Sequence, residues 1–479
     1  MHCSRSIQST LQFRIYALGW LPILFLTACS GDGSRNPTLT GTVAPSASPA
    51  SVVIRWMIGA DQGILPIEVD AEKRIAAQFN AGHDIRLELE IVEGGEVGDR
   101  LREEIARGNG PDIVGPMDMR MASEMGDIWL DLSPLIRANH FDLAQFAEGS
   151  AEYFKDRNGK TISLPFAVDP SFLYYNKTLF DAAGMNYPPA AYDEKYRWQN
   201  ADGSVKELDW DVDTLRQVAL RLTVDAGGKH PSDPGFRRDR IVQFGFASQL
   251  GDLREQASLF GTGSFVGADG TSAQIPDAWR AGIQWYADGM WGAPFLPNAE
   301  YLGTDMLNAG DPFNSGRVAI AQSHLHYTCC LREDIQWDLA PVPSYRGKAT
   351  AVSKGASFFI PAATKYPQEA FAVLQYLTGD AAPALLAVYE QMPALQRVQS
   401  EFWNPLRARY PTVQHWEAAM ASLAHADFPS CMLTMPNNSV AEERIAAFQS
   451  RLLLTPGLDP DRALEELRAE LQAVFIASP

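Results

Sequence analysis

Residues 161–184, TISLPFAVDPSFLYYNKTLFDAAG, constrain the fold of this chain more than any other segment. Two short apolar runs within it, 162–164 and 172–175, have the composition of β-strands. Between these runs, Pro165 and Pro170 lack a backbone N–H, and each favours an extended conformation in the residue before it. The sequence therefore predicts a strand, an exposed and irregular crossover over the four residues between the prolines, and a second strand.

Five short motifs surround this crossover in a fixed order. Two of them come before the crossover or at its start, namely Asn-Gly-Lys at 158–160 and Leu-Pro at 164–165. Three follow it, namely Tyr-Asn-Lys at 175–177, Leu-Phe at 179–180 and Ala-Gly at 183–184. In this order and spacing they resemble the first hinge crossing of the extracellular solute-binding proteins of ABC importers, the family that includes the maltose and multiple-sugar binders. The resemblance implies an α/β, periplasmic-binding-protein-like fold of type II, in which three hinge crossings join two α/β lobes.

The resemblance extends over residues 52–475. Other motifs similar to those of the family are Gly126–Leu132, Trp210–Asp211, Gly316–Ile320, Asp338–Pro343, Lys354–Pro361 and Met392–Ala394. The resemblance implies an N-terminal lobe of residues 52–167 plus 355–393 and a C-terminal lobe of residues 168–354 plus 394–479. A chain of 479 residues is also longer than one hydrophobic core usually serves, which favours two lobes.

The start of the first lobe has the pattern of a parallel sheet. An apolar run at 52–58 reads as a strand, apolar residues recur at helical spacing over 66–79, and residues 85–92 alternate between apolar and polar. A strand, a helix and a strand in this order imply parallel pairing, with a ligand crevice beyond the carboxyl ends of the strands. A further strand at 111–114 is expected to bring Asp118 and Arg120 to the same crevice.

Residues 1–29 have the layout of a secretory signal. Two arginines precede a mostly apolar run at 15–26 that is too short for a stable membrane span. The run ends in Leu-Thr-Ala-Cys, which resembles a bacterial lipobox, so Cys29 is expected to be acylated and to become the first residue after cleavage. The alternative is an ordinary secretory signal with an incidental cysteine. Residues 30–51 hold mainly small and polar residues and are expected to be a flexible tether. We therefore expect an exported protein, lipid-anchored to the membrane and facing the periplasm or the cell exterior.

The charge and the cysteines restrict the partners. A formal net charge of −18 repels nucleic acids and anionic lipid, so neither is expected as a partner, and we expect a monomer without cofactors. Three cysteines, Cys329, Cys330 and Cys431, lie in the globular part. In an oxidising compartment, a disulfide from Cys431 to one of the adjacent pair and a disulfide within the pair both remain open.

Candidate ligand-binding residues follow from the chemistry of sugars. The CH faces of a sugar pack on aromatic rings, whereas its hydroxyl groups need charged or amide partners. Placed by motif and by strand ends, the candidates are Trp56, Asp61, Gln62, Asp118 and Arg120 in the first lobe, Asp169 at the crossing, and Gln249, Asp252, Tyr301, His326 and Asn437 in the second lobe. His326 occupies the position where the family typically has an aromatic platform. For each polar residue the alternative is a solvated loop end or a helix cap, and Trp56 has the alternative of core packing.

Two other kinds of site, a metal site and a glycosidase site, are alternatives to a sugar-binding site. His324 and His326 would share one face of a strand, next to Cys329 and Cys330, as a metal site would require. Adjacent cysteines rarely bind one ion together, however, so no metal is predicted. Asp118 and Asp169 facing each other would suit a glycosidase, but the sequence does not fix their separation, and it shows neither a phosphate-binding loop nor a nucleophile elbow.

These observations predict a binding protein rather than an enzyme. We expect a substrate-binding lipoprotein of an ABC importer that captures a sugar or an oligosaccharide by hinge closure and delivers it to membrane permease subunits. Two alternatives remain open, namely a binder of another solute, such as a polyamine or glycerol phosphate, and an exported glycan hydrolase.

Overall fold

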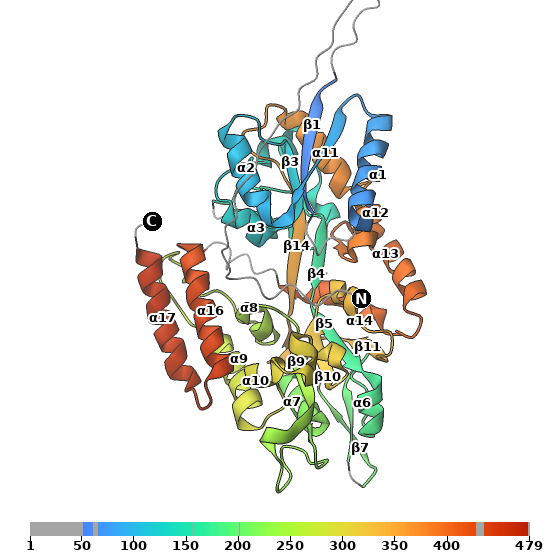
Figure 1. Ribbon diagram of the computed structural model, residues 1–479, viewed down its shortest axis with the longest axis vertical. Coiled ribbons are helices and arrows are strands. Elements are labelled where there is room, and N and C mark those ends of the chain that lie inside the picture. The colour runs from blue at the N-terminus through green and yellow to red at the C-terminus, as the bar shows by residue number, and fades with distance from the viewer. Residues whose placement is uncertain (1–50, 61–65, 157, 201, 428–434, 478–479) are drawn as a thin grey trace, which may run out of the picture.

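The structure is a computed structural model that describes residues 51–60, 66–156, 158–200, 202–427 and 435–477. Figure 1 shows two α/β bodies stacked along the long axis of the molecule, here called the first lobe (upper) and the second lobe (lower). Each body is built around its own β-sheet. The predicted α/β fold with two lobes of the type II class is therefore confirmed.

The first lobe contains a mixed sheet with the strand order β15-β4-β14-β3-β1-β2, and β16 also pairs with β14. Its strands are β1 (Val53–Ala60), β2 (Arg86–Glu93), β3 (Ile113–Asp118), β4 (Ala167–Pro170), β14 (Ala351–Phe359), β15 (Met392–Pro393) and β16 (Ala426–Asp427). β1 is parallel to β2 and β3, whereas β14 is antiparallel to β3 and β4. Its helices are α1 (Pro66–Gly82), α2 (Val97–Ala106), α3 (Met119–Glu124), α4 (Ser133–Ala138), α5 (Ser150–Tyr153), α11 (Pro367–Thr378), α12 (Ala382–Tyr389) and α13 (Gln396–Arg409).

The predicted strand, helix and strand at the start of this lobe are confirmed as β1, α1 and β2 with parallel pairing. Ile75 and Phe79 are buried one helical turn apart on α1, as a helix covering a sheet requires. β1 is buried on both faces, because its consecutive residues Trp56, Met57 and Ile58 are all inaccessible or nearly so.

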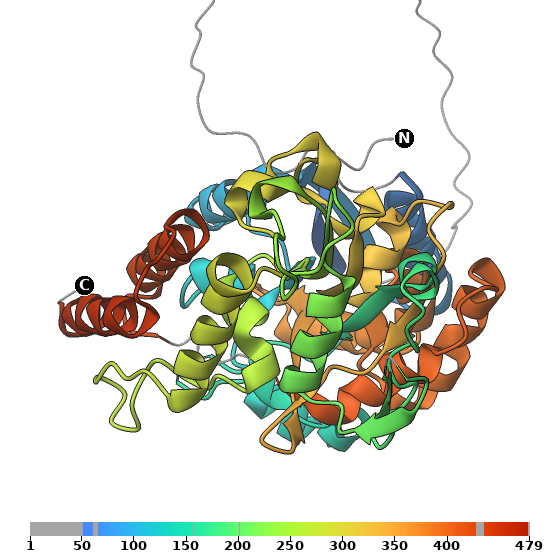
Figure 2. The same ribbon diagram turned by 90° about the horizontal axis from the view of Figure 1, so that it is seen from below.

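The second lobe contains a sheet with the strand order β11-β5-β10-β9-β8. Its strands are β5 (Phe172–Asn176), β8 (Val224–Asp225), β9 (Ile241–Ser248), β10 (Val318–Ser323) and β11 (Trp337–Ala340), and two small hairpins add β6 (Tyr196–Gln199) with β7 (Val205–Leu208) and β12 (Ser344–Tyr345) with β13 (Lys348–Ala349). Its helices are α6 (Lys177–Ala182), α7 (Val212–Leu222), α8 (Leu253–Gln256), α9 (Asp277–Ala287), α10 (Ala299–Leu302), α14 (Trp416–Ala421), α16 (Asn438–Leu454) and α17 (Pro460–Ile476). Figures 1 and 2 show α16 and α17 side by side at the flank of this lobe.

The first crossing differs from the prediction in its details. Residues 162–164 form no strand, and the segment predicted as an exposed, irregular crossover is the buried strand β4. β4 lies between β14 and β15, and Pro170 can end it because a missing N–H is tolerated at a strand terminus. The chain passes to the other sheet at Ser171, whose N–H donates to the carbonyl of Val352. The two sheets are nevertheless separate, as the prediction of two lobes requires.

The later crossings involve β14 and the segment after β15. β14 begins at Ala351, which packs in the core of the second lobe, and it then runs into the sheet of the first lobe. After β15, α13 still packs on α12 and β15, and α14 then contacts β11. The residues directly after Pro393 therefore remain on the first lobe, whereas the prediction placed the boundary there.

Alternate residues of β5 face different hydrophobic cores. Phe172 and Tyr174 belong to the cluster that continues into the first lobe, and Leu173 and Tyr175 belong to a cluster confined to the second lobe. All four side chains are fully buried. No single helix of the described residues is long and apolar enough to cross a membrane; α11 and α12 pass this test only as a pair, which is bent by 58°.

A buried carboxyl group between α1 and α12 makes the stability of the first lobe depend on pH. Glu72 is 4% exposed and accepts a hydrogen bond from the Tyr389 hydroxyl at 2.5 Å. Burial raises the pKa of Glu72 from 4.5 to about 7, and the nearby charge of Glu68 adds to the shift. Between these two values the folded state holds a proton that the unfolded state has lost, so stability falls as the pH rises from about 5 to about 7.

We expect the ionisation of Glu72 to lower the free energy of unfolding by on the order of 3 kcal/mol over that pH interval. Glu72→Gln keeps a hydrogen-bond partner for Tyr389 but cannot titrate, so its unfolding free energy should lack this component. Urea denaturation of both proteins at pH 5 and pH 8 measures the difference. An equal pH response of the two proteins would contradict the assignment.

Candidate functional site

Three strands end beside the crossing between the lobes. β3 ends at Asp118, which lies opposite Ala356 on β14. In the second lobe, the last residues of β10, Gln322 and Ser323, lie opposite the first residues of β5, and β9 runs parallel to β10. The carboxyl ends of β3, β9 and β10 therefore face the crossing from both lobes, which is where ligands bind in open α/β sheets.

Carboxyl groups from both lobes converge on Tyr153 of α5. Its ring covers Gly355 of β14 so closely that an added Cβ there would lie 2.9 Å from the Cδ1 of Tyr153. Burial raises the pKa of the Tyr153 hydroxyl, and the negative charges of Asp118, Glu255 and Asp252 raise it further. Asp118 comes from the first lobe and the other two acids come from the second, so this phenol lies at the boundary between the lobes, in the region that is here called the interlobe cleft.

The floor of this cleft contains an ion pair. Lys354 of β14 places its Nζ 2.7 Å from the Oε1 of Glu255 on α8. Asp252 caps α8 by accepting the N–H of Glu255 at 2.7 Å. Burial raises the pKa of Asp252, and the negative charge of Glu255 raises it further, while Lys354 and Arg254 oppose the shift. Closely spaced acids and bases of this kind can accept and donate hydrogen bonds to a polyhydroxylated ligand.

A charge on α3 acts on a carboxyl group of α16. Burial raises the pKa of Glu442 on α16, whereas the positive charge of Arg120 on α3 lowers it. Arg120 also lies 3.7 Å from Glu124 one turn further along α3. A charge of the first lobe therefore influences an acid of the second lobe.

Comparisons with known proteins agree with this architecture. The family model described as "Bacterial extracellular solute-binding protein" matches residues 66–383, which is more than half of the chain. The chain belongs to this family of solute-binding proteins. No curated protein sequence is significantly similar to it.

Solved structures of similar fold cover most of this solute-binding protein. UspC of M. tuberculosis is 20% identical, with a TM-score of 0.66, and the match covers 88% of this chain and 100% of UspC. The cyclic alpha-maltosyl-1,6-maltose binding protein of Arthrobacter globiformis is 17% identical, with a TM-score of 0.65 and coverage of 88% and 99%. An ABC substrate-binding protein of Listeria monocytogenes, in complex with cycloalternan, is 17% identical, with a TM-score of 0.62 and coverage of 88% and 98%. At these identities the likeness establishes the shared fold.

Two predicted aromatic site residues of the solute-binding protein have other roles. Trp56 is fully buried and donates its indole N–H to the carbonyl of Gly115 at 2.7 Å, so it is a core residue of the first lobe. Tyr301 bonds through its hydroxyl to Arg238 and Ile241, at the amino end of β9 and opposite the cleft. Both were predicted to bind ligand. Trp56 instead packs in the interior, and the half-buried Tyr301 uses its hydroxyl to hold the start of β9.

Asn437 uses its side chain to join α16 to α17. Its amide nitrogen donates to the carbonyls of Val474 at 2.7 Å and Ala477 at 2.9 Å. Gln249 follows β9 as predicted, and its amide donates to Asp311 at 2.9 Å and to the hydroxyl of Tyr327 at 2.8 Å. Both amides are therefore engaged with the protein itself.

Asp169 and His326 form one contact at the crossing. Asp169 is 4% exposed; one carboxylate oxygen accepts the N–H of Leu325 at 3.0 Å and the other lies 2.9 Å from the Nδ1 of His326. Although burial opposes it, the contact with His326 and the nearby charge of His324 lower the pKa of Asp169. Asp169 is thus a buried anchor, and the half-exposed ring of His326 is the part of this pair that solvent reaches.

The predicted strand that would align two histidines is not observed. His324 is buried and precedes a short 3₁₀ helix over Leu325–Cys330, so its ring and that of His326 lie 5.8 Å apart at different depths. In the described part of the chain no group of three His, Cys, Asp or Glu side chains could hold a metal ion. The predictions for Cys29, Asp61, Gln62 and Cys431 concern residues outside the part of the chain that the structure describes, and the side chain of Cys329 also lies outside it.

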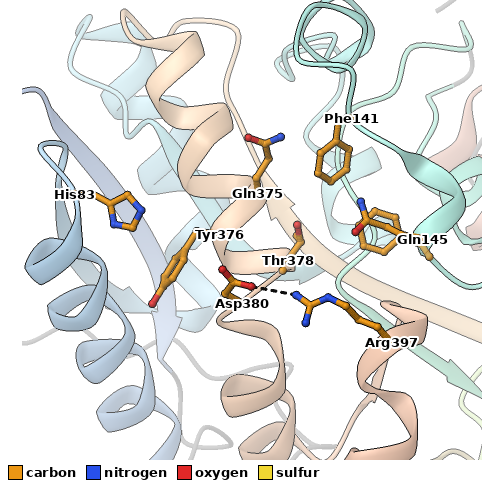
Figure 3. A pocket seen from close by; sticks show the side chains of 10 residues that line it. His83, Phe141, Gln145, Gln375, Tyr376, Thr378, Asp380 and Arg397 are labelled. Carbon is orange, nitrogen blue, oxygen red and sulfur yellow. Dashed lines mark hydrogen bonds and ion pairs between the residues drawn. The ribbon is translucent and has the colours of Figure 1, made fainter.

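A cavity of about 310 Å³ lies elsewhere on the first lobe, between the ends of α1 and α11 and the start of α13. Figure 3 shows the ion pair of Asp380 and Arg397, 3.1 Å apart, together with Phe141 and Gln145 at this cavity. None of the predicted ligand-binding residues lines it. Because the predicted residues Asp118, Asp169 and Asp252 lie at the crossing and not at this cavity, the crossing is the better candidate site.

Sequence reasoning identified Asp118, Arg120 and Asp252 at the cleft but missed Tyr153, Glu255 and Lys354. The signal for Lys354 was present, since it opens the motif that resembles a crossing strand of the family. Tyr153 and Glu255 carried no such signal, because only the packing of α5 and α8 against β14 brings them to the cleft.

Proposed function

We propose that this solute-binding protein captures a neutral sugar or oligosaccharide between its lobes and delivers it to the membrane subunits of an ABC permease. The observation that carries the proposal is the contact between the lobes at the crossing strand, where the Nζ of Lys354 on β14 lies 2.7 Å from Glu255 of the second lobe. Asp118 lies opposite Ala356 on β14, and Asp252 caps the helix of Glu255. Such groups bind a ligand when the lobes close around it, and the ligand then stabilises the closed form.

The ligands named for proteins of similar fold support this class of solute. They include cycloalternan, mannotriose and maltotetraose. Acidic groups outnumber basic groups around the cleft, which disfavours glycerol phosphate. Lys354 at the floor disfavours a polyamine, because it would repel an ammonium group.

The family consists of extracellular binding proteins, and on this basis we propose further properties of the chain. We propose that it acts without catalysis or cofactor, that it is a monomer, and that acylation of Cys29 anchors it to the membrane through a tether of residues 30–51. Mass spectrometry of the protein extracted from membranes would detect the acylated cysteine. An unmodified, soluble protein would overturn the anchor and leave the ligand assignment intact.

Isothermal titration calorimetry tests the ligand class. The full chain is titrated with maltotetraose, mannotriose, mannobiose and D-tagatose, and with spermidine and glycerol 3-phosphate as alternatives. We expect saturable 1:1 binding of at least one sugar and no new reducing ends after prolonged incubation. Binding of spermidine or glycerol phosphate alone would overturn the sugar assignment, and released reducing ends would identify a glycan hydrolase.

Asp118→Asn tests the contribution of the first lobe. One carboxylate oxygen of Asp118 caps α3 at Met121, at 2.8 Å, and asparagine can preserve this cap while removing the charge. We expect sugar affinity to fall about 10-fold, equivalent to about 1.4 kcal/mol, with an unchanged melting temperature. Asp142→Asn is the matched control, because Asp142 is also an exposed cap in the first lobe but lies on the loop before the Leu143–Gln145 turn. Equal affinities of the two variants would contradict the placement of Asp118 at the ligand.

A further inference from the structure

Lys354 lies on β14 close to the point where the chain crosses between the lobes. It lies opposite Asp169 in the pairing of β14 with β4, directly after Ser353, which lies opposite Pro170. Two residues earlier, Val352 accepts the N–H of Ser171, where the chain changes sheet. Lys354 is therefore placed where β14 enters the sheet of the first lobe, at the bottom of the cleft.

The side chain of Lys354 spans the lobes. Its Nζ lies 2.7 Å from Glu255 of the second lobe, and the side chains of the two residues are 43% and 6% exposed. The other carboxylate oxygen of Glu255 accepts the N–H of Gly251 at 3.1 Å. Glu255 is thus held by the protein on both oxygens, whereas the ammonium of Lys354 carries three donors and remains substantially open to solvent.

The surroundings keep this ammonium charged. Burial lowers the pKa of Lys354, but the nearby carboxylates of Glu255, Asp252 and Asp169 together raise this pKa by more, so the net direction is upward. A charged donor in a partly dry cleft forms stronger hydrogen bonds than a neutral one. The same carboxylates would repel an anionic ligand group at this place, and Lys354 itself would repel a cationic one.

We propose that Lys354 binds the ligand directly by donating a hydrogen bond to an uncharged oxygen, either a hydroxyl or a ring oxygen of the sugar. This inference rests on the proposed function and adds a ligand-binding residue supplied by the crossing itself. β14 belongs to the first lobe and Glu255 belongs to the second. A ligand oxygen that accepts a hydrogen bond from the Lys354 ammonium, while this ammonium still pairs with Glu255, is therefore linked to both lobes through one side chain.

The competing explanation is that Lys354 only neutralises the buried Glu255. Variants separate the two roles. Lys354→Met leaves Glu255 buried without a counter-ion, so its melting temperature should fall. The double variant Lys354→Met with Glu255→Gln removes both charges and should recover most of that loss. Lys195→Met is the matched control, because it removes an exposed lysine, directly before β6, whose Nζ lies 2.7 Å from Asp209.

The affinity of each variant is measured by calorimetry with whichever of maltotetraose, mannotriose, mannobiose and D-tagatose binds the unaltered protein most tightly. We expect Lys354→Met and the double variant to bind at least 10-fold more weakly, and Lys195→Met to bind within about 3-fold of the unaltered protein. A double variant that binds as tightly as the unaltered protein would overturn the role of Lys354 alone. Failure of the unaltered protein to bind any of the four sugars would overturn the proposed function and this inference with it.

Discussion

Gly245→Ala is expected to prevent stable folding of the second lobe. An added Cβ at this position in β9 would lie 1.9 Å from the carbonyl oxygen of Ala219 on α7 and 2.4 Å from its Cα. These are backbone atoms of a packed helix, so no side-chain rotation relieves the overlap. The N–H of Gly245 also bonds to the hydroxyl of Thr223 at 2.9 Å, which fixes the strand against the end of the helix.

The cost should exceed about 3 kcal/mol, the upper range for overpacking of a core by side chains alone. Urea denaturation followed by circular dichroism measures it, together with the yield of soluble protein. Gly251→Ala is the matched control, because an added Cβ there would meet no atom within 4 Å. If Gly245→Ala unfolded at the same urea concentration as this control, the close approach of α7 and β9 would be refuted.

The second large effect is expected for Asp169→Ala. This change removes the acceptor of the Leu325 N–H and the partner of His326, and it does so in an almost fully buried place. Unmatched polar groups at a crossing cannot all reach water, so we expect a loss on the order of 3 kcal/mol in unfolding free energy at neutral pH. Sugar affinity should fall as well, because the segment after β10 loses its attachment to β4.

The pH dependence of the unfolding free energy tests whether Asp169 stabilises the fold through its charge or only through packing. The folded state lowers the pKa of Asp169, so its stabilisation is present above the unfolded-state value of ~3.9 and is lost as the pH falls through the lower folded-state value. The difference in unfolding free energy between the unaltered protein and Asp169→Ala should therefore shrink below about pH 4. Glu207→Gln, a change at an exposed residue of β7, should leave stability unaltered at any pH. A difference that is constant with pH would mean that Asp169 stabilises without its charge.

Local patterns were sufficient to predict the fold class. The alternation of β2, the helical spacing of α1 and the order of motifs around the first crossing are all properties of short segments. The crossing itself was misassigned because β4 owes its structure to distant partners. Ala167 and Val168 are paired on both sides by residues of β14 and β15, from the 350s and the 390s, and no pattern within 161–184 contains that information.

The candidate site was predicted only where the chain places polar residues directly at strand ends. Asp118 and Asp252 follow that rule, since both come at or just after a strand and cap the next helix. Tyr153 and Glu255 reach the cleft from helices whose position depends on tertiary packing. Trp56 and Tyr301 show the opposite error. Their rings satisfy the chemistry of sugar stacking, yet Trp56 packs in the core and the half-buried Tyr301 bonds to the start of β9.

The shared strand β14 has a mechanical consequence. Its first residues pair with β16 and accept a bond from Ser171, while its later residues pair with β3 and β4. Rotation of one half of the molecule against the other can then twist a continuous ribbon without breaking its ladder of backbone hydrogen bonds. This rotation would consequently cost little enthalpy. Most of the free energy of the contacts with a bound ligand would then contribute to its affinity.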